Sequence, residues 1–203
     1  MTRATSPDEI AALWHVRHAA SPLLAKMTDV GTSMQFIEDG AVPPQALPEY
    51  VRGIRSILEH HGFTGVIFGH AGDANVHVNP LVDTSRPDWR AHVEAALDEV
   101  VTLTAVLGGT LAGEHGDGRL RTPFMPRLWA NDAMVLFELV KRCFDPRGIL
   151  NPGVKVALAG QTALTDIKYD PTLPPLTPAA SRALNTVADT RGYAQFRLDL
   201  LDG

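Results

Sequence analysis

The chain has 203 residues, 45% of them hydrophobic and 20% charged, which is enough for one globular domain with a substantial core. The formal net charge is -5 and no run of Lys and Arg occurs, which argues against binding to nucleic acid or to an anionic membrane surface. The single cysteine, Cys143, excludes an intramolecular disulfide and a multi-cysteine metal or iron–sulfur site within these residues. We expect Cys143 to be an inert thiol in the core.

No stretch of the chain reaches the roughly 18 uninterrupted apolar residues that a membrane-spanning helix needs. The segment Met1–Leu13 also lacks the apolar core of a signal peptide. We therefore expect a cytoplasmic protein without a membrane span.

The N-terminal part predicts helices on either side of a strand. Apolar residues between Pro7 and Met27 indicate one or two short helices. The segment Thr32–Val42 predicts a strand with a polar interruption, ended by two prolines that cannot continue a central ladder. From Leu47 onward apolar side chains recur at steps of three and four, which predicts a helix that ends at Gly62.

Two short runs rich in β-formers follow, Gly65–His70 and Asn75–Asn79. The connecting residues Ala71–Ala74 are typical of a tight connection between paired strands. Because side chains alternate along a strand, Asn75 and His77 should lie on the face opposite to Val76 and Val78.

The C-terminal part predicts two further helices and a tail. One helix begins near Pro87 and ends at Gly108-Gly109, and another spans about Asp132 to Phe144. Between them, residues Thr110 to Ala112 predict a brief strand. The tail is rich in Pro and Thr, which indicates a linker followed by a short helix near Ser181 to Ala188.

This order of elements predicts an α+β fold in which helices cover an antiparallel sheet. We expect one domain over residues 1–158, followed by a Pro-rich linker and a short helical tail over residues 159–203.

Three of the eight histidines stand out because Gly-rich loops or strand ends surround them. His70 and His77 lie close to Asp73 and Asn75 in the sequence, and His115 follows Glu114. The other five histidines fall in helical contexts, where we expect solvated side chains; these are His15, His18, His60, His61 and His92.

His70 and His77 flank the predicted turn, so strand pairing can bring their imidazoles to one end of the sheet. Two imidazoles and a carboxylate suit a divalent ion such as Zn²⁺ and leave a position open for water or substrate. Glu114 could supply that carboxylate. Spacing alone is weak evidence for such a site and favours the alternative, in which the three side chains share no ligand.

His115 directly follows Glu114, so in an extended backbone the two side chains would point to opposite sides. The flanking Gly113 and Gly116 allow other backbone angles. A histidine beside a metal-bound hydroxyacid could act as general base, because its ordinary pKa of about 6.5 lies near working pH. A loop histidine held by backbone groups is the alternative.

The glycines at 108–109 and 113–118 could be taken for a phosphate-binding loop. They match neither the dinucleotide fingerprint nor the P-loop, and the neighbouring Glu114 and Asp117 would repel phosphate.

Three blocks taken together resemble the signature of the C-terminal domains of FAD-linked oxidases, which belong to the vanillyl-alcohol oxidase-like flavoproteins. They are His70–Pro80 (HAGDANVHVNP), Gly108–Arg121 (GGTLAGEHGDGRLR) and Phe144–Val156 (FDPRGILNPGVKV). The likeness extends over roughly Leu13–Val156. It implies a ferredoxin-like α+β domain on the substrate side of a flavin site, with most of the FAD held by another domain.

The resemblance also implies roles for the polar residues of the first two blocks. In the D-lactate, glycolate and D-2-hydroxyglutarate dehydrogenases, the matching side chains bind a divalent metal, usually zinc, and these fall on His70, His77 and Glu114. The family's catalytic base falls on His115.

Four further positions acquire a role only from this resemblance. Arg17, in a Trp-x-x-Arg stretch, falls on the arginine that binds the substrate carboxylate. Ser21 and Asn75 would line the substrate pocket. Asn151, in the closing Asn-Pro-Gly element, would lie near the flavin.

The sequence also departs from the family pattern. Ala74 stands where Gly is usual, Asp117 where an apolar residue is common, and Ile37 near a lysine that some members use for substrate. The stretch Met34–Pro44 and the tail are similar to the long bacterial members that continue into a cysteine-rich domain. An iron–sulfur cluster would belong to such an extension and not to these residues.

The resemblance therefore implies the substrate- and metal-binding C-terminal part of an FAD-dependent D-2-hydroxyacid dehydrogenase, inactive without its FAD-binding domain. The expected partners are that domain, fused or separate, a small 2-hydroxyacid and an iron–sulfur electron acceptor, and a peripheral place at the inner membrane is compatible with them. Two alternatives stay open, a non-catalytic metal-binding or interaction module and a hydrolytic metalloenzyme that uses the same residues.

Overall fold

The computed structural model describes residues 3–24, 31–164 and 174–190, with side chains described to residue 15 in the first range and to residue 186 in the last. The chain divides into two compact units, Met1–Thr165 and Asp166–Gly203. In the second unit the described element is helix α7 (Pro178–Thr190), which is longer than the helix predicted at Ser181 to Ala188. No helix among the described residues is long and apolar enough to cross a membrane.

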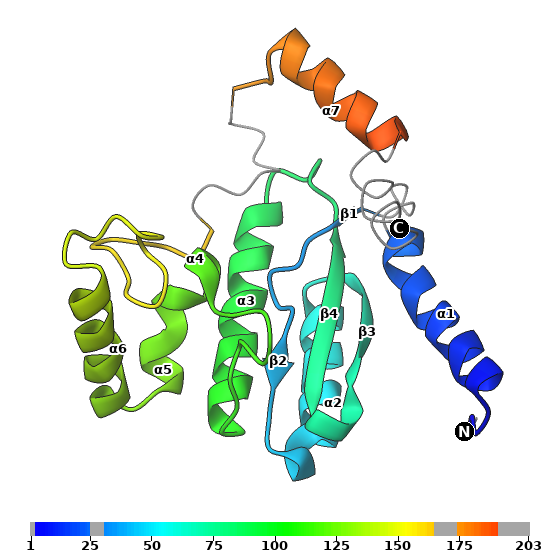
Figure 1. Cartoon of the computed structure of the whole chain (residues 1–203), viewed down its shortest axis with the longest axis horizontal. Helices are drawn as coiled ribbons and strands as arrows, with labels where there is room; N and C mark the ends of the chain where they lie inside the picture. The colour runs from blue at the N-terminus through cyan, green and yellow to red at the C-terminus, as the bar shows by residue number, and fades with distance from the viewer. Residues whose placement is uncertain (1–2, 25–30, 165–173, 191–203) are drawn as a thin grey trace. The chain divides into compact units, whose positions relative to one another are not determined.

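An antiparallel sheet organises the first unit, and its central strand is β4 (Asn75–Val82) (Figure 1). Strand β3 (Thr64–His70) pairs along the full length of one edge of β4. Two short strands, β1 (Thr32–Ser33) and β2 (Gly40–Ala41), pair with opposite ends of the other edge. The arrangement confirms the predicted α+β class.

The interrupted strand predicted over Thr32–Val42 is reduced to β1 and β2, because the segment between them leaves the sheet. Asp39 adopts a left-handed backbone conformation with φ of 78°, which a continuous strand cannot accommodate. The apolar side chains of Met34, Phe36 and Ile37 are nevertheless buried. The polar interruption of this segment is therefore a packed turn that carries acidic side chains inward.

Two helices form the layer that packs on the sheet. Helix α2 (Leu47–His60) packs against β3, and helix α3 (Trp89–Val106) packs against α2. Gly53 permits the close approach of the helices, since a Cβ there would lie 2.5 Å from a methyl carbon of Leu103. The buried stripes consist of Tyr50, Ile54, Ile57 and Leu58 on α2, and Val93, Ala96, Leu97, Val100, Val101 and Thr104 on α3.

The strand predicted at Thr110 to Ala112 is reduced to one antiparallel bridge between Thr110 and Ala41. With this bridge, the order of elements from β2 to Thr110 follows the split βαββαβ arrangement of ferredoxin-like folds. The bridge matters because it fixes the start of the loop 111–117 next to β2 and the beginning of β4.

Short helical turns and one long helix follow, namely α4 (Gly118–Arg121), α5 (Met125–Leu128) and α6 (Asn131–Phe144). Single 3-10 turns occur at Pro44–Ala46, Ala71–Asp73 and Thr122–Phe124. Helix α1 (Pro7–Leu24) begins where Ser6 Oγ accepts the N–H of Glu9 and the Glu9 carboxylate accepts the N–H of Ser6.

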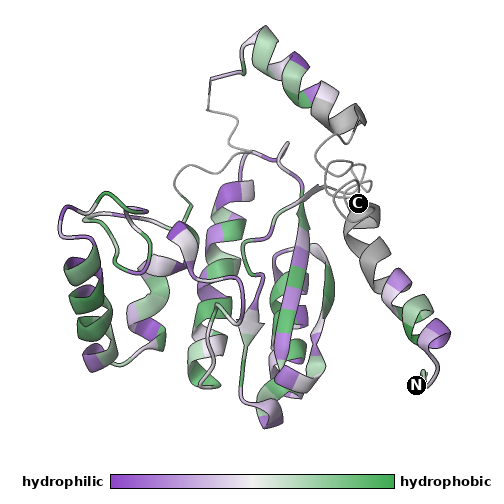
Figure 2. Cartoon of the chain, viewed as in Figure 1, coloured by the Kyte–Doolittle hydropathy of each residue, from purple (hydrophilic) through white to green (hydrophobic). Residues whose placement is uncertain are grey.

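The apolar stripe of α6 does not enter a core, as the predicted packing required. Figure 2 shows this helix as one of the most apolar segments of the chain. Five of its apolar residues are 52–82% exposed, namely Val135, Leu136, Leu139, Val140 and Phe144. Cys143 is exposed as well, so the expectation of a core thiol is wrong. The periodicity identified an apolar helix face but could not show what covers it.

Candidate functional site

The register of the central hairpin places His70 and His77 on the same face of the sheet. Phe68 pairs with His77 and His70 pairs with Asn75, so these side chains project to one side. The ring centroids of His70 and His77 are 5.4 Å apart and the rings are nearly perpendicular. His77 is buried, whereas the imidazole of His70 is 42% exposed.

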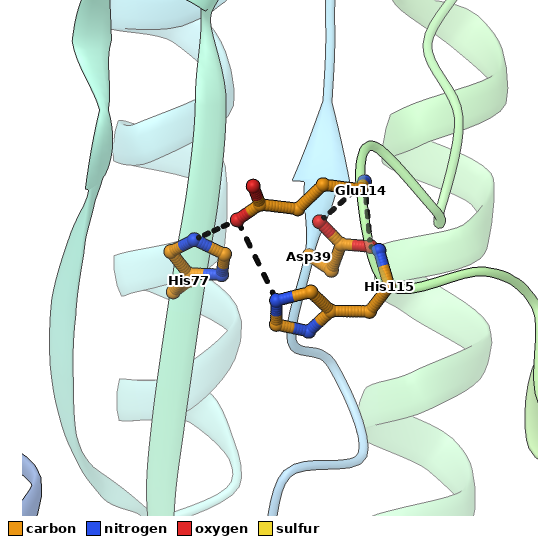
Figure 3. Close-up of side chains that lie close together, drawn as sticks. All are labelled: Asp39, His77, Glu114 and His115. Atoms are coloured by element: carbon orange, nitrogen blue, oxygen red, sulfur yellow. Dashed lines mark hydrogen bonds and ion pairs between the residues drawn. The ribbon is translucent and has the colours of Figure 1, made fainter. Parts of the chain in front are cut away.

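The loop that carries Glu114 and His115 is held by the buried carboxylate of Asp39. Oδ1 accepts the backbone N–H of Glu114 at 3.1 Å, and Oδ2 accepts the N–H of His115 at 2.7 Å. The side-chain amide of Asn75 donates to Oδ1 at 2.9 Å, and the backbone N–H of Gly113 donates to the Asp39 carbonyl at 2.9 Å. Asp39 thereby ties the loop to β4 (Figure 3).

Three imidazoles meet at one carboxylate oxygen. The Oε1 atom of Glu114 lies 2.9 Å from Nε2 of His77, 3.3 Å from Nε2 of His70 and 3.5 Å from Nε2 of His115. Figure 3 shows the side chain of Glu114 extending from the loop 111–117 toward the imidazole of His77 on β4, next to the imidazole of His115. The loop geometry therefore brings the neighbours Glu114 and His115 to one point, as the flanking glycines allowed.

Glu38 is a further member of the cluster and was not among the residues predicted for the site. Its Oε2 lies 2.8 Å from Nδ1 of His115 in a hydrogen bond, and its Oε1 lies 3.0 Å from Nδ1 of His77. The guanidinium of Arg121 lies 3.5 Å from the same carboxylate and donates to the Glu38 carbonyl. An acidic pair inside an apolar run, Glu38-Asp39, was the available sequence signal.

The hydrogen-bond network determines which ring nitrogens carry lone pairs. Because Glu38 is an acceptor, His115 donates from Nδ1 and keeps a lone pair on Nε2. The Nδ1 atom of His77 is buried near Glu38 but lacks the geometry of a hydrogen bond. A lone pair on Nε2 of His115, next to the imidazoles of His70 and His77 and the carboxylate of Glu114, gives an imidazole–carboxylate donor set that fits a zinc-like divalent ion.

Asp39 also lies among the potential ligand atoms, which in Asp39, His77, Glu114 and His115 fall within 4.8 Å of one another. Burial alone raises the pKa of Asp39, but the N–H of His115, the Asn75 amide and the N–H of Glu114 together lower it below the ordinary value. An anionic carboxylate whose oxygens already accept these donors is suited to holding the loop. His70 is not part of that group of four, but its Nε2 lies 3.3 Å from Oε1 of Glu114, and it stays the predicted third ligand.

The remaining predicted residues lie in three different settings. Asn75 is buried at the cluster, and its Oδ1 has no hydrogen-bond partner among the described residues. Asn151 is exposed in the turn after α6, where its carbonyl accepts the N–H of Val154 at 3.2 Å, so its place near a flavin stays a prediction. Arg17 and Ser21 lie in α1, and their side chains are outside the described residues.

Comparison with known proteins identifies the family of the chain. Residues 1–154 match the family described as FAD linked oxidases, C-terminal domain. The chain is 36% identical over 146 residues to D-2-hydroxyglutarate dehydrogenase of Pantoea ananatis (72% of the chain, 14% of the relative) and 33% identical over 150 residues to glycolate oxidase subunit GlcD of Bacillus subtilis (74% and 31%). It is 36% identical over 125 residues to D-lactate dehydrogenase of Archaeoglobus fulgidus (61% and 27%).

The chain thus spans less than a third of the length of each of these relatives. Its matched segment includes the hairpin of His70 and His77 and the loop of Glu114 and His115. Since the family match covers residues 1–154 of 203, the chain belongs to the C-terminal domain family of the FAD-linked oxidases.

Proposed function

We propose that the chain is the substrate- and metal-binding part of an FAD-dependent D-2-hydroxyacid dehydrogenase. The observation that carries the proposal is the convergence of three imidazole Nε2 atoms on Oε1 of Glu114. The names of the relatives point to an α-hydroxycarboxylate of the lactate, glycolate or 2-hydroxyglutarate type.

His70, His77 and Glu114 would hold the metal. The ion would supply Lewis acidity that lowers the pKa of the substrate hydroxyl and stabilises the developing alkoxide. Glu38 beside Nδ1 of His77 is the kind of acceptor that commonly orients a ligating histidine. FAD, held mostly by a partner domain, would supply the acceptor for the hydride that leaves the α-carbon.

His115 is the candidate general base. Its imidazole is 47% exposed, so a substrate can reach it, while its Nδ1 is fixed by the hydrogen bond to Glu38. That bond leaves Nε2 free to accept the hydroxyl proton, and the nearby anionic Glu38 stabilises the imidazolium that forms. Arg121, which lies 3.5 Å from the Glu38 carboxylate and donates to the Glu38 carbonyl, holds that side chain in place.

Arg17 would bind the substrate carboxylate, and Ser21 and Asn75 would line the pocket. The buried Oδ1 of Asn75 is a free acceptor at the cluster, which is compatible with contact to a polar ligand. The exposed apolar face of α6 supports a further contact with the FAD-binding part of the enzyme, because an apolar helix face of this size is rarely left in water. A cytoplasmic location and an iron–sulfur electron acceptor remain predictions.

The proposal is tested by kinetics of the complete flavin-containing enzyme on D-lactate and D-2-hydroxyglutarate. His115→Ala should lower kcat by about 10²-fold to 10⁴-fold with unchanged FAD content, as loss of a general base does. Arg17→Ala should mainly raise KM, because the guanidinium contacts the carboxylate in both ground and transition states. Arg52→Ala, on the exposed side of α2, is the matched control and should change neither constant.

Three results would contradict the proposal. Near-normal kcat in the His115→Ala enzyme on the better substrate would return His115 to a structural role in its loop. Unchanged metal content in a His70→Ala, His77→Ala double variant would refute the ligand assignment, whatever the activity. Activity on neither substrate, with metal still bound, would favour a metal-binding module.

A further inference from the structure

A second histidine cluster lies where helices α2 and α3 pack together. His60 is the last residue of α2 and His61 caps its end. Glu99 and His92 are seven residues apart on α3, which places them two turns apart on one helix face. The predicted solvated state is wrong for His61, whose side chain is only 8% exposed.

The contacts form a chain of four groups. Glu99 Oε1 lies 3.0 Å from Nε2 of His61, whose Nδ1 lies 3.5 Å from Nδ1 of His92. Nε2 of His92 in turn lies 3.3 Å from Oδ2 of Asp88. A second imidazole reaches the same oxygen of Glu99, since Nδ1 of His60 lies 3.5 Å from it.

With both histidines neutral, the three contacts of this chain have only two N–H donors, and either a proton or a metal ion can supply the missing positive charge. Each neutral imidazole has one N–H, and the carboxylates of Glu99 and Asp88 only accept hydrogen bonds. Two neutral histidines therefore supply two donors for three contacts. If His92 donates to Asp88 and His61 donates to His92, the lone pair on Nε2 of His61 faces the anionic oxygen of Glu99.

We propose that His60, His61 and Glu99 form a second site for a divalent transition-metal ion such as Zn²⁺. Their ligand atoms lie within 4.8 Å of one another. Ligands of a tetrahedral zinc ion stand about 3.3 Å apart, given zinc-to-ligand distances near 2.0–2.1 Å, so the spacings of 3.0 and 3.5 Å to Glu99 need little adjustment. Imidazole nitrogen and carboxylate oxygen are ligands that zinc accepts.

The surroundings favour a cation at this position. The backbone C=O groups of α2 point toward its C-terminus, so the helix dipole places partial negative charge beside His60 and His61. His92 would orient the ligating His61 through its other ring nitrogen, with Asp88 behind it, as outer partners of metal ligands do. His60 and Glu99 are 71% and 41% exposed, so water can reach an ion at this position as a further ligand.

The second site is separate from the first. His61 precedes strand β3 and His70 ends it, so a strand of seven residues, about 20 Å long, lies between the two clusters. An ion bound here would join the end of α2 to α3, which makes the site structural and independent of the proposed oxidation chemistry.

The test is zinc binding to the purified 203-residue chain, followed by calorimetric titration with zinc chloride after chelator treatment. The His70→Ala, His77→Ala background removes the first site and should retain one zinc equivalent. Adding His60→Ala and Glu99→Gln should weaken this remaining binding by about tenfold or more, since loss of a ligand costs at least as much as loss of an outer partner. Both residues are exposed enough for the variants to fold.

Side-chain nitrogen resonances of the histidines give a second readout. Zinc should shift the ring nitrogens of His60 and His61 in the His70→Ala, His77→Ala background, and Glu94→Gln, an exposed carboxylate on the same helix, should leave the binding unchanged. No zinc binding in that background, or equal binding after His60→Ala and Glu99→Gln, would overturn the proposal. The missing charge would then be a proton shared between His61 and Glu99.

Discussion

Asp39 determines where the two loop residues of the first cluster lie. It combines a left-handed backbone conformation with a carboxylate of 0% exposure, both of which are costly unless neighbouring groups compensate. Compensation comes from the donors of Glu114, His115 and Asn75, which satisfy both oxygens. The fold thus uses one buried anion to hold a loop next to a strand that is distant in sequence.

Asp39→Asn should destabilise the chain by about 1–3 kcal/mol at neutral pH, the usual cost of losing hydrogen bonds to a buried charged group. The pKa of Asp39 is lowered in the folded state, so its contribution is present above the unfolded pKa of about 3.9 and is lost as pH falls through the folded value. The stability difference between the wild type and Asp39→Asn should therefore be constant above about pH 5 and shrink below about pH 4. Urea unfolding of both proteins across this range measures it.

Asp73→Asn is the control for that series, because Asp73 is exposed in the turn before β4. Its effect on stability should stay within about 0.5 kcal/mol at neutral pH. If the difference in unfolding free energy between the wild type and Asp39→Asn did not change with pH, the contribution of the carboxylate to stability would not depend on its charge.

The residues that sequence could predict are those inside local motifs. His70 and His77 flank a recognisable turn, and Glu114-His115 lie in a glycine-flanked block, so their approach was foreseen. Glu38 was missed because its partner His115 is 77 positions away in the sequence, and such a pairing appears only when the strands are in register. His61 was misjudged for the same reason, since Glu99 lies on a different helix.

At the level of elements, the loop 111–117 depends on close contact with the hairpin. A Cβ at Gly113 would lie 2.3 Å from Nδ2 of Asn75 and 3.2 Å from Oδ1 of Asp39. Only a residue without a side chain lets the loop approach β4 this closely. Gly113 therefore fixes the distance between Glu114 and the histidines of the hairpin.

Gly113→Ala should cost about 1–3 kcal/mol, because the added methyl group displaces Asn75 and breaks the contacts of Asp39. It should also reduce metal binding at the first cluster, as Glu114 moves away from His70 and His77. Gly72→Ala is the matched control, since a Cβ there meets no atom within 4 Å, and its effect should stay within about 0.5 kcal/mol. Equal urea midpoints for the two variants would show that the loop can move without cost.

Elements with a strong period were predictable, and those defined by distant partners were not. The apolar periodicity of α2 and α3 predicted the bounds of these helices to within a few residues. The hairpin was predicted from its turn and from the alternation of polar and apolar residues, which Figure 2 displays along β4. The strand prediction for residues 32–42 was wrong over most of its length, because apolar residues buried in a turn resemble a strand in composition. The predicted burial of the apolar face of α6 was wrong, because periodicity does not show which surface covers a helix face.

For the whole molecule, the end of the first unit depends on a short segment beyond the last helix of that unit. Leu164 is 2% exposed, and its carbonyl accepts a hydrogen bond from Arg90 of α3 at 2.8 Å. Gln161 donates to the carbonyls of Arg119 and Gly153 at 3.0 and 2.9 Å. Residues 159–164 therefore pack on the first unit, whose compact part extends to Thr165.

Two shortened chains test this boundary. A chain that ends at Thr165 should melt at the same temperature as the full chain, because it keeps the buried Leu164 side chain and the contacts of Gln161. A chain that ends at Leu158 loses both, and exposing the pocket of one buried leucine costs about 1.5–3 kcal/mol, so its Tm should fall by about 5–10 °C. Leu164→Ala in the full chain should reproduce much of this fall, since a buried leucine replaced by alanine typically costs about 2–5 kcal/mol. If the chain ending at Leu158 melted with the full chain, residues 159–164 would contribute nothing to the first unit, and the domain would end where the sequence alone first suggested.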